Sequence, residues 1–183
     1  MIFSRDAVFI LIYQGVKLDF MEKKIELKKI TWQNYYRICK LKVNKEQRNF
    51  VAENKWSLIH AYVGISNGMP AYPFGIYLGR KAIGFCMCGF NSWEKGDPEF
   101  MKNNYFVWRF MIDKNYQGNG YGKEAFKQLL EFIKTFPNGK SELCWLSYEP
   151  ENEVAKKMYA SFGFIEAPEF YKEGEEMPAI LKL

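Results

Sequence analysis

The chain has 183 residues, of which 48% are hydrophobic and 26% charged, with one His and a formal net charge of +5. This is ordinary globular composition at the length of one domain, so it excludes a disordered, collagen-like or low-complexity chain. The basic excess lies in residues 21–60, with 10 basic against 4 acidic groups, whereas residues 140–183 carry 5 against 9. No run of Lys or Arg exceeds two residues, so we expect no nucleic-acid partner.

The first 20 residues differ from the rest of the chain. Their apolar run, residues 7–13, is too short to span a bilayer, and no small-residue cleavage site follows it. We therefore expect residues 1–20 to be an N-terminal appendage or an upstream mis-start, and residues 21–183 to be one domain with no membrane partner. The four cysteines form no C-x-x-C pair and the only histidine, His60, is distant from them, so we expect free thiols in a cytoplasmic protein and no metal site.

The hydrophobic pattern predicts alternating strands and helices in chain order. We expect a strand over 23–30, a helix from 32 capped by Thr31, and a helix over 46–66 on the apolar positions Trp56, Ile59 and Val63. A hairpin over 74–90, a strand over 105–112, an amphipathic helix over 121–136 and a strand over 142–148 follow. A helix over 152–162 and strands over 164–171 and 177–183 complete the chain. This mixture is typical of the α/β or α+β class.

A glycine-rich loop between the strand 105–112 and the helix 121–136 is the strongest local signal. It reads Gln117, Gly118, Asn119, Gly120, Tyr121, Gly122, with Lys123 next. Free N–H groups at a helix start, with the helix dipole and a lysine, favour a phosphate or pyrophosphate. The spacing matches neither the P-loop nor the dinucleotide fingerprint, and a glycine-rich turn without a ligand stays open.

A second motif begins the next helix. Asn152 is a good helix N-cap, and Tyr159 lies about two turns further on, on the same side as Ala155 and Phe162. Taken alone, Asn152 is equally well explained as a plain cap and Tyr159 as a core aromatic residue.

Together the two motifs resemble the GCN5-related N-acetyltransferase (GNAT) family. They are Q-x-x-G-x-G at 117–122 and N-x-x-A-x-x-x-Y at 152–159, followed by Gly163 and Phe164, and the resemblance covers about residues 22–183. Within the family, the segments 109–113 and 146–164 are similar to the bacterial spermine/spermidine (diamine) acetyltransferase-like branch. The resemblance implies a GNAT fold, with a mixed sheet of six to seven strands, a splayed parallel pair and about four helices.

The resemblance also implies a role for each matching residue. Acetyl-CoA would be the co-substrate, with its pantetheine arm in the wedge between the splayed strands against the main chain of Met111 and Ile112. The N–H groups of residues 118–123 would hold the pyrophosphate, with Gln117 opening the loop, and Asn152 would bind the pantetheine side. Tyr159 would face the sulfur as general acid, because a phenol can protonate a departing thiolate.

The general base is less well determined by the sequence. Some family members carry a Glu on the strand before the glycine loop, but the corresponding residue here is Phe106. We therefore expect a relayed water, with Glu149 as the best side-chain candidate and His60 a remote one. Acids that would border the acceptor site are Glu94, Asp97 and Glu99. Trp108 and Arg109 would line its face, although adjacent strand residues are expected to point to opposite sides.

We expect direct acetyl transfer to a small-molecule primary amine, first of all a polyamine such as spermidine or spermine. The acidic residues 140–183 would attract such a polycation. Alternatives are another amine (an aminoglycoside-like antibiotic, an amino acid or a protein N-terminus) or a non-catalytic acyl-CoA sensor. A homodimer is also open, since family members often dimerise.

Overall fold

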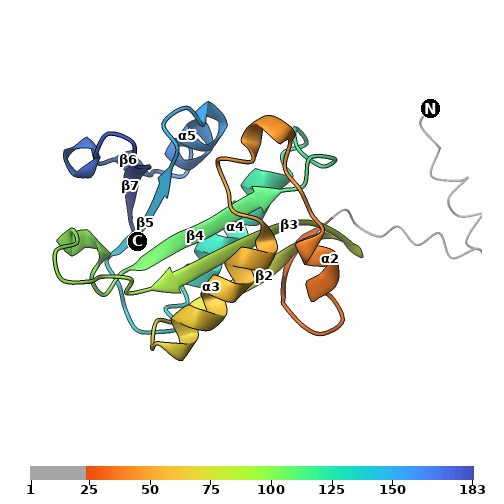
Figure 1. Cartoon of the computed structure of the whole chain (residues 1–183), viewed down its shortest axis with the longest axis horizontal. Helices are drawn as coiled ribbons and strands as arrows, with labels where there is room; N and C mark the ends of the chain where they lie inside the picture. Colours follow the sequence, from red (N-terminus) through yellow and green to blue (C-terminus); the bar gives the residue numbers. More distant parts are fainter. Residues whose placement is uncertain (1–23) are drawn as a thin grey trace, which may run out of the picture.

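The computed structural model describes residues 24–183, so the expectation about residues 1–20 lies outside the described part of the chain. A seven-stranded sheet forms the centre, in the order β1-β2-β3-β4-β5-β7-β6 (Figure 1). The strands are β1 (Ile25–Lys29), β2 (Ala71–Leu78), β3 (Lys81–Phe90), β4 (Tyr105–Ile112), β5 (Leu143–Tyr148), β6 (Ile165–Glu166) and β7 (Met177–Lys182). Only β4 and β5 are parallel among these pairs, which confirms the predicted mixed sheet with one parallel pair.

The described α-helices cover both faces of the sheet: α2 (Tyr35–Cys39), α3 (Asn54–Ser66), α4 (Tyr121–Ile133) and α5 (Glu153–Ala160). In Figure 1, α3 crosses one face while α4 lies behind the other. The α4 side chains Phe126, Leu129 and Ile133 are fully buried in the larger core cluster, as their predicted amphipathic spacing requires. A smaller cluster around Ile38 and Ala61 fixes α2 and α3 to the opposite face. No helix within residues 24–183 is long and apolar enough to cross a membrane.

The predicted helix over 46–66 is wrong in its first half and in its buried face. A short 3-10 helix, η1 (Lys45–Gln47), is followed by irregular chain, and α3 begins only at Asn54. The buried positions of α3 are Asn54, Ser57, Ala61 and Gly64, whereas Trp56, Ile59 and Val63 are about half exposed. Small side chains let α3 approach the sheet closely, and the buried Asn54 Nδ2 donates to the Ile38 carbonyl at 2.9 Å. This tertiary contact overrides the apolar periodicity.

Further boundaries also differ from the sequence prediction. The helix predicted from residue 32 with Thr31 as its cap begins only at Tyr35, and Asn34 occupies the N-cap position. The predicted strand over 164–171 shrinks to β6, because Pro168 lacks an N–H for the ladder and starts a 3-10 helix, Pro168–Phe170. The predicted helix over 121–136 ends at Ile133.

All four cysteines are free thiols, and burial raises the pKa of Cys88 to about 12.

Gly84 allows β3 and β4 to approach each other closely near the end of β4. A Cβ at Gly84 would lie 2.5 Å from the Met111 carbonyl oxygen. We expect Gly84→Ala to lower the free energy of unfolding by about 1–3 kcal/mol, because the backbone must shift to relieve this overlap. Gly122→Ala is the matched control, since its Cβ would have no neighbour closer than 3.6 Å and alanine favours a helix. Urea denaturation measures the free energy of unfolding of both variants. Equal values for the two variants would contradict the close approach of the strands.

Candidate functional site

The parallel pairing of β4 and β5 stops early. Only Tyr105 with Cys144 and Phe106 with Trp145 are paired, although both strands continue toward their carboxyl ends. Each strand keeps its other neighbour throughout: β4 pairs with β3, and β5 pairs with β7 along its whole length. A cavity of about 480 Å³ opens where the strands separate, lined by the second half of β4, the glycine loop, the end of β5 and α5. This confirms the predicted splayed pair.

The ladder between β3 and β4 determines which main-chain groups face the wedge. The Asp113 N–H donates to the Ile83 carbonyl at 2.8 Å, and Ile112 is opposite Gly84. Because hydrogen-bonded and non-bonded pairs alternate in an antiparallel ladder, Ile112 directs its N–H and carbonyl away from β3 toward the wedge. Met111 directs its own groups to β3. The geometry therefore favours Ile112 over Met111 for main-chain bonds to a pantetheine arm, while Met111 still lines the cavity.

The glycine loop forms a cradle for an anion. Among residues 24–183, the N–H groups of residues 118–122 donate to no protein oxygen. Gly118 and Gly120 have φ angles of 76° and 78°, a left-handed conformation that favours glycine, and Gly120 is the N-cap of α4. Free donors, the helix dipole and the charge of Lys123 at one point suit a pyrophosphate. The residues present thus fit the phosphate end of acetyl-CoA.

The Gln117 side chain does not reach into this cradle. It donates from Nε2 to the Ile112 carbonyl at 2.9 Å and to Gln47 Oε1 at 3.0 Å. The next residue but one, Asn119, turns its Nδ2 back onto the Gln117 carbonyl at 2.8 Å. Both amides stabilise the loop from within, and the main chain is left to face the cavity.

Asn152 serves as the helix cap, as its position predicts. Its Oδ1 accepts from the Ala155 N–H at 3.1 Å. The same residue lines the cavity, and its Nδ2 has no protein partner among the described residues, so the amide can donate to a ligand as well. The plain-cap reading and the binding reading are therefore compatible.

Tyr159 also combines a core role with a cavity position. Its ring packs against Phe126 and Tyr148, with centroids 5.1 Å and 5.7 Å away, and it lines the cavity. Its hydroxyl has no hydrogen-bond partner within residues 24–183. Burial, and secondarily the negative charge of Glu176, raise the pKa of Tyr159 well above its ordinary value. The phenol therefore stays protonated at every physiological pH, as a proton or hydrogen-bond donor requires.

A β-bulge interrupts β4 at Trp108, next to Arg109. Met87 pairs with Arg109 and Cys88 with Val107, so Trp108 is the extra residue. Both residues line the cavity, as does every residue from Val107 to Ile112, while the Trp108 ring packs toward α3 and stacks on His60. The expectation that only one of the two side chains faces the wedge stays a prediction. The Arg109 Nη1 donates to the Trp108 carbonyl at 2.7 Å, while its buried Nε has no partner. Burial lowers the pKa of Arg109, an effect that Glu176 partly offsets.

Glu176 is the acidic site residue that sequence analysis missed. It precedes β7, accepts a hydrogen bond from Ser147 Oγ, and lines the cavity. Its position depends on the register that pairs Met177 with Tyr148, and nothing in the acidic stretch 173–176 marks it. The lining also includes residues between α2 and α3, among them Gln47 and Phe50, which were assigned to a helix.

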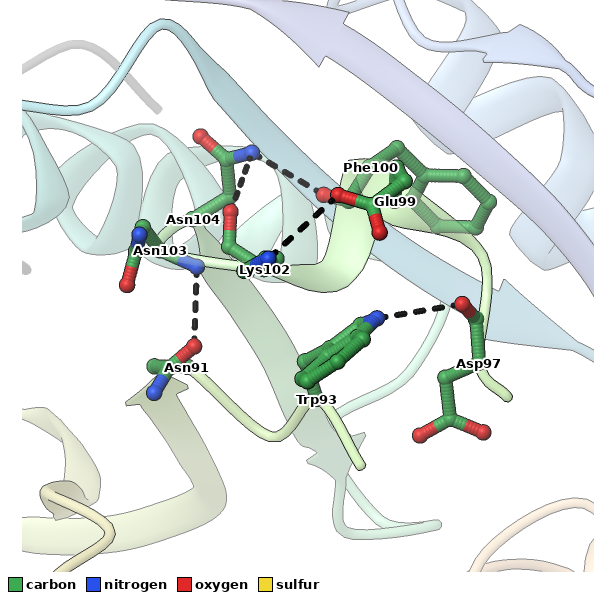
Figure 2. A network of polar contacts seen from close by, with 8 residues as sticks. All are labelled: Asn91, Trp93, Asp97, Glu99, Phe100, Lys102, Asn103 and Asn104. Carbon is green, nitrogen blue, oxygen red and sulfur yellow. Dashed lines mark hydrogen bonds and ion pairs between the residues drawn. The ribbon is translucent and has the colours of Figure 1, made fainter. Parts of the chain in front are cut away.

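The other predicted acids lie elsewhere. Glu149 follows β5 but does not line the cavity. Glu94, Asp97 and Glu99 lie in the loop before β4, where Figure 2 shows a local polar network. Trp93 Nε1 donates to the Asp97 carbonyl at 3.0 Å, and Lys102 pairs with Glu99 at 3.8 Å. None of these three acids lines the cavity. His60 does not line it either; it is exposed, and its ring stacks on that of Trp108 with the ring centroids 6.2 Å apart.

Comparison with known proteins identifies this arrangement. The model of the acetyltransferase (GNAT) family matches residues 26–164. A probable spermine N(1)-acetyltransferase of Bacillus subtilis subsp. natto (strain BEST195) is 29% identical over 145 residues, which are 76% of this chain and 87% of that protein. The spermine/spermidine N(1)-acetyltransferase of Bacillus subtilis (strain 168) is 28% identical over the same shares.

Solved structures show the same fold at low identity. Spermidine N-acetyltransferase from Vibrio cholerae, in complex with CoA and spermine, has a TM-score of 0.62 and 15% identity, over 86% of this chain and 95% of that one. Aminoglycoside acetyltransferase AAC(6')-Ib, in complex with CoA and kanamycin, has a TM-score of 0.66 and 13% identity, over 87% of this chain and 95% of that one. Acceptors in these structures differ, so the shared fold alone does not determine the amine.

Gly120→Val tests the anion cradle. We expect acetyl-CoA affinity to fall by at least about tenfold, because a branched side chain opposes the left-handed backbone that directs the N–H groups. Gly139→Val is the matched control, since Gly139 also has a positive φ, 108°, but lies outside the cavity. Isothermal titration calorimetry that gives both variants the same affinity would contradict the assignment.

Tyr159→Phe tests the hydroxyl. We expect turnover to fall by about 10²-fold or more while acetyl-CoA still binds, because the ring and its packing remain. Tyr105→Phe removes a buried hydroxyl that bonds Gly139 outside the cavity, and its turnover should stay near that of the wild type. Steady-state rates of thiol release and binding titrations check both variants. Equal turnover in Tyr159→Phe and the wild type would exclude a chemical role.

Proposed function

Because the chain belongs to the acetyltransferase (GNAT) family and is an acetyl-CoA-dependent N-acetyltransferase, we propose that its acceptor is a primary amine of a polyamine such as spermidine or spermine. The observation that carries the proposal is Glu176, the single carboxylate among the described residues that line the cavity. A polyamine presents several ammonium groups, and the Glu176 carboxylate, which lines the cavity and stays exposed to solvent, attracts them. The names of the Bacillus relatives support the same class of acceptor.

Acetyl-CoA supplies an acetyl group activated as a thioester. In our proposal the N–H groups of residues 118–122 hold its pyrophosphate, and the Ile112 N–H lies beside the reacting carbonyl as a donor to the developing oxyanion. The Asn152 amide fixes the pantetheine side, and the Tyr159 hydroxyl donates to the departing sulfur. No side-chain nucleophile is needed, because the amine attacks directly.

The acceptor must lose a proton before it attacks, since an alkylamine with a pKa near 10.4 is mostly charged at neutral pH. Two charged groups of the cavity act on this equilibrium. The partly buried Arg109 cation opposes a second positive charge nearby and favours the neutral amine, whereas Glu176 accepts a proton directly or through water. Of the two candidate carboxylates we favour Glu176 over Glu149, because Glu176 lines the cavity.

Trp108 gives the acceptor side of the cavity an aromatic wall. The Arg109 guanidinium lies 5.8 Å from the centre of its ring, so this face already holds one cation. The methylene chain between the nitrogens of a polyamine can pack on such apolar surface while its distal ammonium groups reach Glu176. A cytoplasmic location, the absence of a nucleic-acid partner and a homodimer stay predictions.

Glu176→Gln tests the acceptor assignment. We expect KM for spermidine to rise about tenfold or more, because a charge-assisted contact is lost while the shape is kept. Glu175→Gln is the control, since Glu175 pairs with Lys172 and does not line the cavity. Thiol release from acetyl-CoA is measured against spermidine, spermine, putrescine, an aminoglycoside and amino acids.

Turnover with the polyamines alone would support the proposal, and turnover confined to another amine would overturn the acceptor while leaving the reaction in place. Glu149→Gln is measured in the same series. A larger loss of kcat in Glu149→Gln than in Glu176→Gln would transfer the proton-accepting role to Glu149.

A further inference from the structure

We propose that Gln117 is a positioning residue that couples the acetyl-CoA loop to the α2–α3 segment (residues 42–52), which forms the wall of the same cavity opposite α5. Through this link, cofactor binding would order the cavity wall that residues 42–52 form, in the same cavity as the acceptor side at Trp108 and Glu176. The inference deepens the proposed function, because it assigns regulation to the same site, but it does not depend on which amine is acetylated.

The first observation is the set of hydrogen bonds around Gln117. Its Nε2 donates to Gln47 Oε1 at 3.0 Å and to the Ile112 carbonyl at 2.9 Å, and its Oε1 accepts from Asn44 Nδ2 at 3.1 Å. One carboxamide thus joins the end of β4, the root of the glycine loop and a segment about 70 residues earlier in the chain. All of these groups are partly buried, where water competes poorly for the same bonds.

The α2–α3 segment has little regular structure to hold it otherwise. Between α2 and α3 it contains only the 3-10 helix η1 (Lys45–Gln47), whose capping box uses the same Asn44 and Gln47. The Asn44 N–H donates to Gln47 Oε1 at 3.1 Å, so this single oxygen receives both the cap and the Gln117 bond. Loss of Gln117 therefore removes a bond from the only helical turn in the segment.

A second contact fixes the other end of the link. The buried Asp113 accepts from the Lys42 N–H at 2.9 Å, and the Lys114 N–H donates to the Lys42 carbonyl at 2.9 Å. These bonds attach the start of the segment to the turn after β4 and act as a hinge. Beyond it, Gln117 controls how the remainder approaches the cavity (Figure 1, orange chain between α2 and α3).

The segment then supplies much of the cavity wall. Its lining residues are Val43, Gln47, Asn49, Phe50, Val51 and Ala52. The same cavity is lined by Gly118, Gly120 and Gly122, so the cofactor loop and the wall share one space and one connecting side chain. A ligand that immobilises the glycine loop lowers the cost of ordering the wall, and by linkage an ordered wall favours the cofactor equally.

Hydrogen–deuterium exchange with CoA as the probe tests the coupling without any acceptor. In the wild type, saturating CoA should slow exchange about threefold or more in peptides covering residues 42–52 and in those covering the glycine loop. In Gln117→Ala and Gln47→Ala, protection of the glycine loop should remain at saturating CoA, whereas protection of residues 42–52 should be lost. Gln47→Ala lies outside the cofactor loop, so the test survives if Gln117→Ala binds CoA poorly.

Gln47→Glu is the matched control. Both described bonds to this side chain use Oε1 as an acceptor, and a carboxylate can accept both, so protection of residues 42–52 should persist in this variant. With spermidine, Gln117→Ala and Gln47→Ala should raise the acceptor KM by about threefold to tenfold with little change in kcat, and the double variant should resemble either single one.

Full protection of residues 42–52 by CoA in Gln117→Ala and Gln47→Ala would overturn the coupling, as would no protection in the wild type. Additive effects of the two substitutions on KM would also contradict it. A failure of spermidine as acceptor would instead leave the exchange result intact, so the two proposals fail separately.

Discussion

The site depends on one interruption in the sheet, the end of pairing between β4 and β5 after Phe106 and Trp145. Each strand stays fixed by a long antiparallel partner, so neither can bend to close the gap. Backbone polar groups left in such a gap are costly unless they find partners. The protein satisfies two carbonyls of β4 from its own side chains: Arg109 donates to Trp108, and Gln117 donates to Ile112. The Ile112 N–H is left for a ligand that lies along the strand.

The bulge at Trp108 has a comparable effect on the chemistry of the cavity. The inserted residue interrupts the alternation of side chains along β4 where this strand lines the cavity. Partial burial of the Arg109 guanidinium costs free energy of desolvation, and the lowered pKa of Arg109 reflects that cost. Among the described residues that line the cavity, Arg109 and Glu176 are the two with formally charged side chains, and their charges are opposite. In the proposed mechanism, this pair of charges would favour an acceptor that is neutral at one nitrogen and charged at another.

Local sequence signals predicted the elements that carry strong periodicity or special backbone. The amphipathic helix α4, the glycine turn before it and the cap at Asn152 were all correctly predicted. The signals failed where tertiary contacts decide. The apolar residues of α3 are exposed because Asn54 and small residues form its packing face, and the cavity wall at residues 48–52 has no period at all. Glu176 and the Trp108 bulge depend on strand register, which no pattern within one strand reveals.

The role of Tyr159 follows from comparing two acids. An ordinary thiol has a pKa near 8.5 and an ordinary phenol one near 10, so complete proton transfer from the phenol to the thiolate is already unfavourable. Burial raises the pKa of Tyr159 further and widens this difference. In the proposed mechanism, the hydroxyl would therefore stabilise the departing sulfur as a hydrogen-bond donor that keeps most of its proton. The departing thiolate would then acquire a proton from the acceptor nitrogen through Glu176 or water, and this route would link amine deprotonation to sulfur departure.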